Sequence, residues 1–140
     1  MASLGVTGPI YALGGLDDNT CYSTVERYDA ESNSWSQVQD MNFPRGGVAV
    51  ASINVRQKFG TPLRLFLLFT IPVFVVQKYL YAVGGNDGAA SLDSCERYDP
   101  HLNKWTVMAS MNKRRAGAGC AELEGVLYVV GEFILNFCSS

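Results

Sequence analysis

The sequence has a single histidine, and its four cysteines include no CxxC pair. Zinc and copper sites gather several histidine, cysteine or carboxylate ligands, so no metal site is predicted. His101 stands alone in the stretch DPHLN, and we interpret it as a solvent-exposed turn residue. No nucleophile with a base and no paired catalytic carboxylates stand out either. The sequence therefore predicts neither an enzyme nor a cofactor.

An excess of charge of one sign is also lacking, because 11 lysines and arginines stand against 13 aspartates and glutamates, for a net charge of −2. The basic residues are spread along the chain, so no basic face follows a phosphate backbone, and nucleic acid is not an expected partner. The first residues, MASLGVTG, lack the basic start and apolar stretch of a secretory signal. We expect a cytoplasmic protein with reduced thiols at Cys21, Cys95, Cys120 and Cys138.

Long apolar runs are absent apart from residues 65–76. As a helix this run would span ~18 Å, well short of the ~30 Å hydrocarbon core of a bilayer. It also contains Pro72. A membrane is therefore not an expected partner.

The sequence does contain an internal repeat. IYALGG at residues 10–15 recurs as LYAVGG at 80–85 and as LYVVG at 127–131. In the first two copies the second glycine is followed by a tyrosine, a tryptophan and an arginine at identical intervals. A fixed period of this kind indicates a repeat architecture. The landmarks are Gly15, Tyr28, Trp35 and Arg45 in one copy and Gly85, Tyr98, Trp105 and Arg115 in the next.

Short runs rich in valine, tyrosine, isoleucine and leucine, separated by glycine, asparagine and aspartate, predict antiparallel strands rather than helices. We place strands at residues 46–52, 79–83, 94–98 and 104–108. The first of these reads GGVAVAS, and its counterpart in the next copy reads AGAGCAE. Small residues are expected where strands converge on a crowded axis, so this strand is predicted to be the innermost of a four-stranded sheet.

The glycine pairs end strands at points where a Cβ would obstruct the turn of the chain. The tryptophans have the bulk to fill the wedge between neighbouring sheets, and their repetition at a fixed offset favours this role over ligand stacking. The structural motif thus consists of Gly14, Gly15, Tyr28, Trp35, Gly84, Gly85, Tyr98 and Trp105.

The order of apolar strand, double glycine, VERYD or CERYDP, N-x-W and an arginine before small residues resembles the kelch repeat, and within it the BTB-kelch, or kelch-like, family. The resemblance covers the chain apart from a central insertion and the C-terminal tail. It implies an all-β fold, a partial kelch β-propeller with about two four-stranded antiparallel blades and the start of a third. It also implies a protein-interaction module that recognises substrates for a cullin-3 ubiquitin ligase adaptor, with the BTB and BACK domains absent. An actin-associated scaffold and a non-functional truncated isoform are the alternatives.

The insertion interrupts the repeat in its middle. The stretch from Arg45 to Tyr81 is much longer than its counterpart from Arg115 to Tyr128. The extra segment and the tail follow no kelch pattern, and we hypothesise that both are translated intron sequence. The expected divisions are 1–54 for a truncated blade and the next inner strand, 55–77 for the apolar insertion, 78–131 for the second blade and the start of a third, and 132–140 for the tail.

Antiparallel order places the loop that enters each inner strand and the loop between the second and third strands on one face. In the family such loops hold partner peptides, and the resemblance places Arg45 and Arg115 where relatives present arginine to acidic side chains, a task that suits the guanidinium group. The alternative is that each arginine pairs with a loop aspartate of its own or the adjacent blade. The recurring Glu-Arg dipeptide of VERYD and CERYDP is assigned to internal packing or sheet-edge pairing. The candidate partner-binding residues are Arg45, Arg115, Asp17, Asp18, Asn19, Ser23, Asn86, Asp87 and Asp93.

Overall fold

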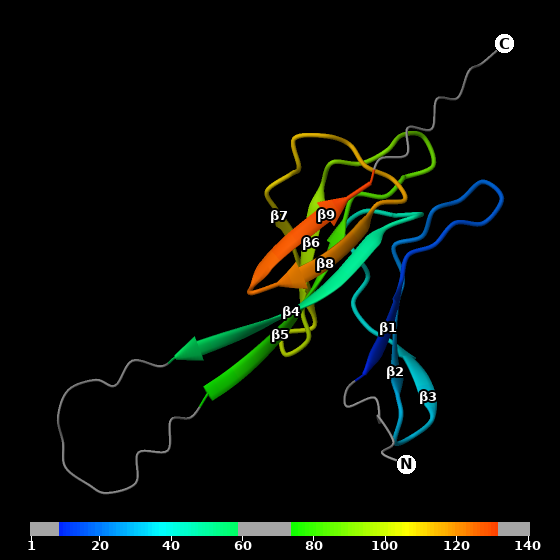
Figure 1. Ribbon diagram of the computed structural model, residues 1–140. Helices are drawn as coiled ribbons and strands as arrows, with labels where there is room; N and C mark the ends of the chain where they lie inside the picture. Colours follow the sequence, from blue (N-terminus) through cyan, green and yellow to red (C-terminus); the bar gives the residue numbers. More distant parts are fainter. Residues whose placement is uncertain (1–8, 59–73, 132–140) are drawn as a thin grey trace, which may run out of the picture.

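The computed structural model describes residues 9–58 and 74–131 (Figure 1). Regular structure in these residues consists of β-strands, which confirms the predicted all-β class. A search of the same residues finds no helix with the length and apolar character needed to span a membrane. The strands are β1 (Ile10–Leu13), β2 (Val25–Asp29), β3 (Ser34–Gln37), β4 (Ala49–Lys58), β5 (Phe74–Val83), β6 (Cys95–Asp99), β7 (Lys104–Met108), β8 (Gly119–Leu123) and β9 (Val126–Val130).

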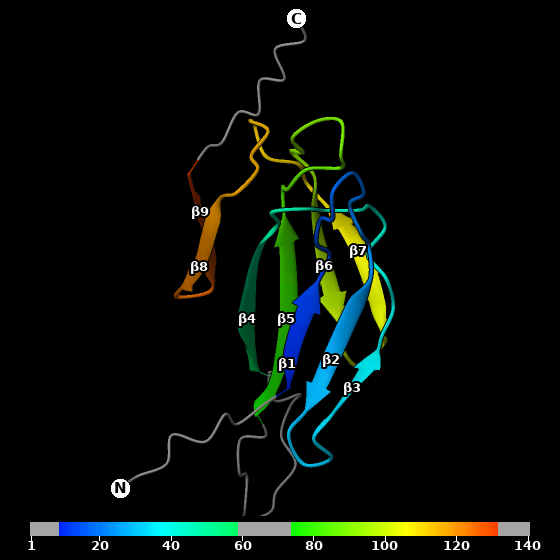
Figure 2. The same ribbon diagram turned by 90° about the vertical axis from the view of Figure 1, so that its right-hand side faces the viewer.

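The strands form three antiparallel sheets, which we call blades. Blade 1 has the order β1-β2-β3, blade 2 has the order β4-β5-β6-β7, and blade 3 is the hairpin β8-β9. Figure 2 shows blade 1 in front of blade 2, with blade 3 beside β4. β4 lies at one edge of its sheet and contacts both strands of blade 3, so it is the innermost strand, as predicted.

The repeat in the sequence is also a repeat in strand register. Tyr28 pairs with Trp35 across β2 and β3, and Tyr98 pairs with Trp105 across β6 and β7. The two pairs of rings have nearly the same centroid separation, 5.2 and 5.1 Å. Each tyrosine hydroxyl donates to the asparagine shortly before the tryptophan, at 2.8 Å in blade 1 and 2.9 Å in blade 2. The offset in sequence that takes Tyr28 to Tyr98 therefore relates equivalent positions of blades 1 and 2.

The first glycine of each pair has a left-handed backbone, with φ of 59° at Gly14 and 62° at Gly84. A Cβ at Gly14 would lie 2.3 Å from the carbonyl oxygen of Arg45, and a Cβ at Gly84 would lie 2.3 Å from that of Arg115. The glycines thus let the β1–β2 and β5–β6 loops pass directly against the segment that leads into the next inner strand, which confirms their predicted geometric role.

The main apolar core lies between blades 1 and 2. Tyr98 and Trp105 of blade 2 pack with Val25 and Met41 of blade 1, and all four are buried. Tyr11 of blade 1 meets Tyr98 edge to face, with ring centroids 5.9 Å apart. Burial of apolar side chains of this size stabilises the fold by about 1.5 to 3 kcal/mol each, so this contact holds the two sheets together. The predicted wedge role is confirmed for Trp105.

The interruption of the repeat falls between β4 and β5. Their ladder runs from Ala49 opposite Val83 to Lys58 opposite Phe74. Residues 55–58 and 74–77, at the two ends of the expected insertion, therefore continue the strands of blade 2 and do not leave the sheet. Its centre, residues 59–73, and the tail lie outside the described residues.

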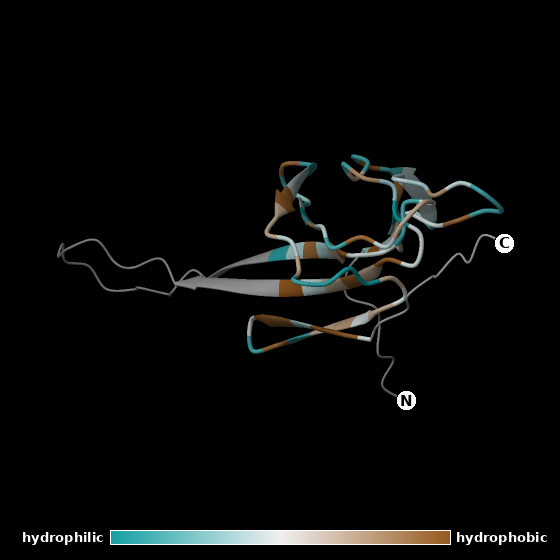
Figure 3. Cartoon of the chain, turned by 90° about the horizontal axis from the view of Figure 1, so that it is seen from above, coloured by the Kyte–Doolittle hydropathy of each residue, from teal (hydrophilic) through white to brown (hydrophobic). Residues whose placement is uncertain are grey.

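Blade 3 exposes several large apolar side chains. Seen from above in Figure 3, the β8–β9 hairpin is a mainly brown ribbon on the outside of the molecule. Four of its large apolar side chains are more than half exposed, namely Leu123, Val126, Tyr128 and Val130, while Leu127 and Val129 are half-buried.

Candidate functional site

Four connections meet at one end of the blades, the upper end in Figure 2. They are the β1–β2 loop (residues 14–24), the β5–β6 loop (residues 84–94) and the segments that lead into β4 and β8 (residues 38–48 and 109–118). We call this end the loop face. It is the face that the sequence predicts for partner binding, and the antiparallel strand order places it as expected.

The β1–β2 loop presents carboxylates at its tip. A bridge between Leu16 and Cys21 closes the loop, and the backbone amide of Thr20 donates to Oδ1 of Asp17 at 3.1 Å. The Tyr22 hydroxyl donates to the other carboxylate oxygen, and this hydrogen bond is the main cause that lowers the pKa of Asp17 below its ordinary value. Asp17 stays ionised at neutral pH and is exposed, as are the next two candidates, Asp18 and Asn19.

The β5–β6 loop repeats this arrangement in blade 2. Oδ1 of Asp87 accepts hydrogen bonds from the backbone amides of Ala89 and Ala90, both at 2.8 Å. These amides, that of Ala90 first, lower the pKa of Asp87, with a smaller contribution from the charge of Arg114. A Cβ at Gly88 would lie 4.0 Å from the carbonyl oxygen of Asn19, so the tips of the two loops are neighbours. Exposed carboxylates on two consecutive blades therefore share one surface.

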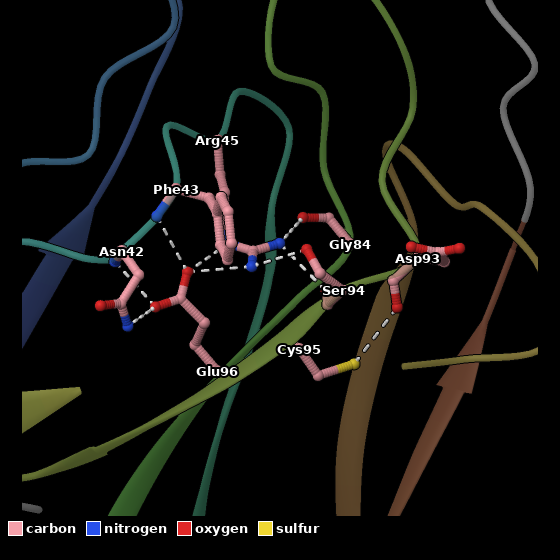
Figure 4. A network of polar contacts seen from close by, with 8 residues as sticks. All are labelled: Asn42, Phe43, Arg45, Gly84, Asp93, Ser94, Cys95 and Glu96. Carbon is pink, nitrogen blue, oxygen red and sulfur yellow. Dashed lines mark hydrogen bonds and ion pairs between the residues drawn. The ribbon is translucent and has the colours of Figure 1, made fainter. Parts of the chain in front are cut away.

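Arg45 does not belong to that surface, because its side chain is fully buried between blades 1 and 2 (Figure 4). Its Nη1 donates to the carbonyl oxygens of Gly84 at 2.6 Å and Ser94 at 3.0 Å. Its Nη2 donates to the Ser94 hydroxyl at 2.9 Å and to Oε1 of Glu96 at 2.9 Å, and its Nε donates to the same Oε1 at 3.2 Å. All donor nitrogens of the guanidinium are thus satisfied by blade 2.

Glu96, the partner of Arg45, is buried to the same degree. Its Oε2 accepts from the backbone amide and the side-chain amide of Asn42, at 2.8 and 2.6 Å, and its Oε1 accepts from the amide of Phe43 at 3.2 Å. The carboxylate is therefore held by donors from the segment that leads into β4, and we call the whole set the Arg45–Glu96 clasp. A buried ion pair offsets the cost of its desolvation only when its remaining hydrogen bonds are made, as they are here.

The predicted role of Arg45 in partner binding is therefore wrong. A side chain with 0% exposure and a complete set of acceptors cannot reach a ligand. The alternative of a loop aspartate is also not what the structure shows, since the partner is a strand glutamate of the adjacent blade. The sequence signal was the strict recurrence of Glu26 and Glu96 in register with Arg45 and Arg115, but charge alone does not say which glutamate each arginine meets.

Arg115 is the counterpart of Arg45 one blade later and is only half-buried. Its Nη1 donates to the carbonyl oxygen of Gly131 at 2.6 Å, which repeats the bond from Arg45 to Gly84. The arginine thus reaches toward blade 3 rather than over the loop face, and its role in partner binding stays a prediction.

The remaining candidates lie below the tips. Asn86 is 8% exposed, its Oδ1 accepts from the amide of Gly88 at 2.6 Å, and its backbone pairs with Gly46, so it shapes the loop instead of contacting a partner. Ser23 and Asp93 are half-buried, and their carbonyl oxygens accept from the amides of Met41 and Met111, both at 2.9 Å. The sequence does not separate the tip of a loop from its base, and the roles of Ser23 and Asp93 in partner binding stay predictions.

Cys21 is buried within the β1–β2 loop, whereas Cys95, Cys120 and the histidine lie outside the four connections of the loop face. Cys21, Cys95 and Cys120 are free, and burial raises the pKa of Cys95 and of Cys120, so these two thiols stay protonated at neutral pH. His101 is an exposed turn residue, as predicted, at the opposite end of the blades. It borders a cavity of about 540 Å³ between blades 1 and 2, whose other walls include Tyr11, Val50, Lys78 and Leu80.

Comparison with known families gives a consistent picture. The Kelch motif matches residues 2–42 and 71–112. Kelch-like protein 4 of Homo sapiens is 41% identical over 94 residues, which are 67% of this chain and 10% of that protein. Kelch-like protein 13 of Mus musculus is 30% identical over 132 residues, covering 89% of this chain and 17% of that protein. Kelch-like protein 7 of Rattus norvegicus is 31% identical over 121 residues, covering 86% and 17%.

A comparison of structures supports the same architecture. The solved structure of YjhT matches with a TM-score of 0.59 and 18% identity over 89% of this chain and 34% of that one. Identity this low shows the fold alone. The chain has the fold of a partial β-propeller, and it spans between 10% and 17% of the length of the three kelch-like relatives.

Proposed function

The chain belongs to the kelch-repeat family, and from this premise we propose that its loop face recognises a protein substrate for a cullin-3 ubiquitin ligase adaptor in the cytoplasm. The observation that carries the proposal is the pair of neighbouring loop tips, which present Asp17, Asp18 and Asp87 from two consecutive blades. Binding residues concentrate on loops that a rigid scaffold positions, and both loops are held to their blades by repeated backbone hydrogen bonds.

The chemistry of the tips indicates which partner they suit. The exposed carboxylates of Asp17 and Asp87 are kept ionised by hydrogen bonds within their own loops, and Asp18 adds a further negative charge. Arg45 is buried in the clasp and does not contact a ligand, so the preference for an acidic ligand that the sequence predicts is replaced by the opposite one. We propose that the bound segment carries lysine or arginine, whose ammonium or guanidinium groups donate to these carboxylates.

The connection to the ligase is proposed from the family resemblance. In adaptors of this kind a BTB domain docks cullin-3 while the propeller holds the substrate, so the proposed link runs through domains outside the sequence printed above. Within the family, the runs ALGGLDDNTCYSTVERYD and AVGGNDGAASLDSCERYDPHLNKW resemble repeats of kelch-like protein 8 or a near relative, and this closer kinship is likewise a proposal.

A fusion tests the function directly. We would join the chain to the BTB and BACK domains of a kelch-like relative and measure, with cullin-3 present in cells, which proteins gain ubiquitin. Asp18→Lys combined with Asp87→Lys should abolish these gains, because the loop tips lose their charge. Glu31→Lys, an exposed site on the β2–β3 turn at the far end of the blade, is the matched control and should leave them unchanged.

Two results would contradict the proposal. The first is a set of ubiquitinated proteins that is the same for the loop variant and the control. The second is co-sedimentation of the chain with filamentous actin that survives the loop substitutions, which would favour the cytoskeletal scaffold.

A further inference from the structure

Phe43 is a large apolar side chain that stays on the surface of the loop face. It lies on the segment that leads into β4 and is 43% exposed. The loops on either side of this segment, β1–β2 and β5–β6, both belong to the described residues. The exposure of Phe43 is therefore that of a side chain whose neighbours along the loop face are in place.

The repeat does not require an apolar residue at this position. The offset that takes Tyr28 to Tyr98 takes Phe43 to Lys113, so the next copy carries a charged side chain there. The clasp uses only the backbone amide of Phe43 as a donor, which any residue except proline supplies. The aromatic ring is thus specific to the junction of blades 1 and 2.

The structure holds this ring in place. The Phe43 amide donates to Oε1 of Glu96 at 3.2 Å, and the guanidinium carbon of Arg45 lies 5.8 Å from the ring centroid (Figure 4). Arg45 is itself fixed by its bonds to blade 2. An aromatic side chain that is ordered before binding loses little conformational entropy when a partner packs on it.

Acidic loops flank Phe43 on both sides. Two residues beyond it, the amide of Arg45 donates to the carbonyl oxygen of Tyr22 in the β1–β2 loop at 2.9 Å. The amide of Gly46 then donates to the carbonyl oxygen of Asn86 in the β5–β6 loop at 2.7 Å. The tips of these two loops carry the carboxylates that the proposed function uses. An aromatic anchor with a polar rim is a common arrangement in protein interfaces, and the loop face has it.

We propose that Phe43 is the apolar anchor of the partner site, and that the bound segment carries a bulky apolar side chain with a lysine or arginine on each side. This inference rests on the proposed function, in which the loop tips bind basic groups. The apolar side chain packs on the exposed part of the ring, and the flanking basic groups donate to the carboxylates of Asp17, Asp18 and Asp87. Segments that are basic but lack the apolar residue bind less tightly, and apolar segments with acidic flanks are repelled.

Fluorescence anisotropy with labelled synthetic peptides and the full chain tests the proposal. Each peptide has a phenylalanine between two lysines, separated from them by glycine spacers of different lengths, and each has a partner peptide with alanine in place of phenylalanine. With the spacer that binds best, the phenylalanine peptide should bind the unmodified chain about 10-fold more tightly than its alanine partner, as expected for an aromatic anchor. Phe43→Gln should remove this preference and leave the affinity for the alanine peptide unchanged.

Matched variants separate the anchor from a general change of the surface. Leu102→Gln removes an exposed apolar side chain from the β6–β7 turn, at the opposite end of the blades, and should leave the preference unchanged. Phe43→Leu keeps an apolar side chain and should keep most of the preference. Asp18→Lys combined with Asp87→Lys should weaken the binding of both peptides, and circular dichroism checks that each variant folds.

The peptide pair on the unmodified chain tests the anchor even if a variant fails to fold. Equal affinities for the phenylalanine and alanine peptides with every spacer would overturn the anchor and leave the role of the loop tips intact. A preference that survives Phe43→Gln in the folded variant would also overturn it. Binding that the two aspartate substitutions leave unchanged, or that is absent for every peptide, would contradict the proposed function and this inference together.

Discussion

Blades 1 and 2 carry the same side chains at the same register positions and nevertheless differ in burial. Trp105 is 5% exposed and Trp35 is 50% exposed, although each stacks on its own tyrosine with similar geometry. Blade 2 has blade 1 against this side, whereas no described residue covers the same side of blade 1. The comparison shows that a residue of a repeat protein takes its energetic role from the neighbouring unit.

The largest expected loss of stability follows from removing the arginine of the Arg45–Glu96 clasp. Arg45→Met leaves Glu96 buried without its cation and should lower the free energy of unfolding by about 3 to 5 kcal/mol, as loss of one partner of a buried pair does. Arg115→Met removes a half-buried side chain with one bond to Gly131 and should cost about 1 kcal/mol or less. Urea unfolding followed by tryptophan fluorescence measures both.

A double substitution checks the reason for this difference. Arg45→Met with Glu96→Leu removes both charges, so much of the lost stability should return. If the double variant is as unstable as Arg45→Met alone, the cost arises from packing around residue 45 and the unpaired carboxylate is not its source.

Tryptophan truncation sharpens the comparison without any change of charge. Trp105→Ala opens the core between the blades and deletes the bond to Gln39, for an expected loss of about 3 to 5 kcal/mol. Trp35→Ala should cost about 1 kcal/mol, the contribution of its stacking on Tyr28. Equal losses measured by urea unfolding at low protein concentration would contradict the burial that separates these residues.

The fold could be predicted from the sequence because it depends on short-range rules. The spacing of Gly15, Tyr28 and Trp35 and its recurrence determined the register, and the run of small residues identified β4 as the inner strand. The extension of β4 and β5 into residues 55–58 and 74–77 was not foreseen, since those residues carry no repeat signature. Pairing across a ladder continues wherever two extended segments can exchange hydrogen bonds.

The site was predicted less well, for a physical reason. Position in the repeat told which loops share a face, and Asp17, Asp18 and Asp87 are exposed there. It did not tell whether a long side chain points outward or into the adjacent blade. Arg45 points inward because Glu96 and two carbonyl oxygens satisfy it there, and such a match between blades is visible only once the sheets are placed side by side.

Substitution of the first glycine of each pair tests a feature that blades 1 and 2 share. Gly14→Ala and Gly84→Ala should each cost about 2 kcal/mol or more, since alanine resists the left-handed backbone and its Cβ would meet a carbonyl oxygen at 2.3 Å in both blades. Gly119→Ala in β8 is the control, with open space around its Cβ and an expected change within about 0.5 kcal/mol. If only Gly84→Ala lowers the free energy of unfolding, the β1–β2 loop shifts to accommodate a Cβ and the β5–β6 loop does not.

The smallest expected effect compares how the two loops hold their carboxylates. The Tyr22 hydroxyl is the main cause that lowers the pKa of Asp17, whereas backbone amides lower that of Asp87. Tyr22→Phe should raise the pKa of Asp17 toward its ordinary value of 3.8 and leave that of Asp87 in place, as measured by carboxyl NMR titration. A carboxyl group whose pKa is lowered in the folded state stabilises the fold at pH values above its ordinary pKa. This contribution is lost as the pH falls through the pKa of the folded state. The stability difference between the variant and the unmodified chain should therefore be largest above about pH 4 and should shrink on acidification. If Tyr22→Phe leaves the pKa of Asp17 unchanged, the hydrogen bond from the Thr20 amide is what lowers that pKa.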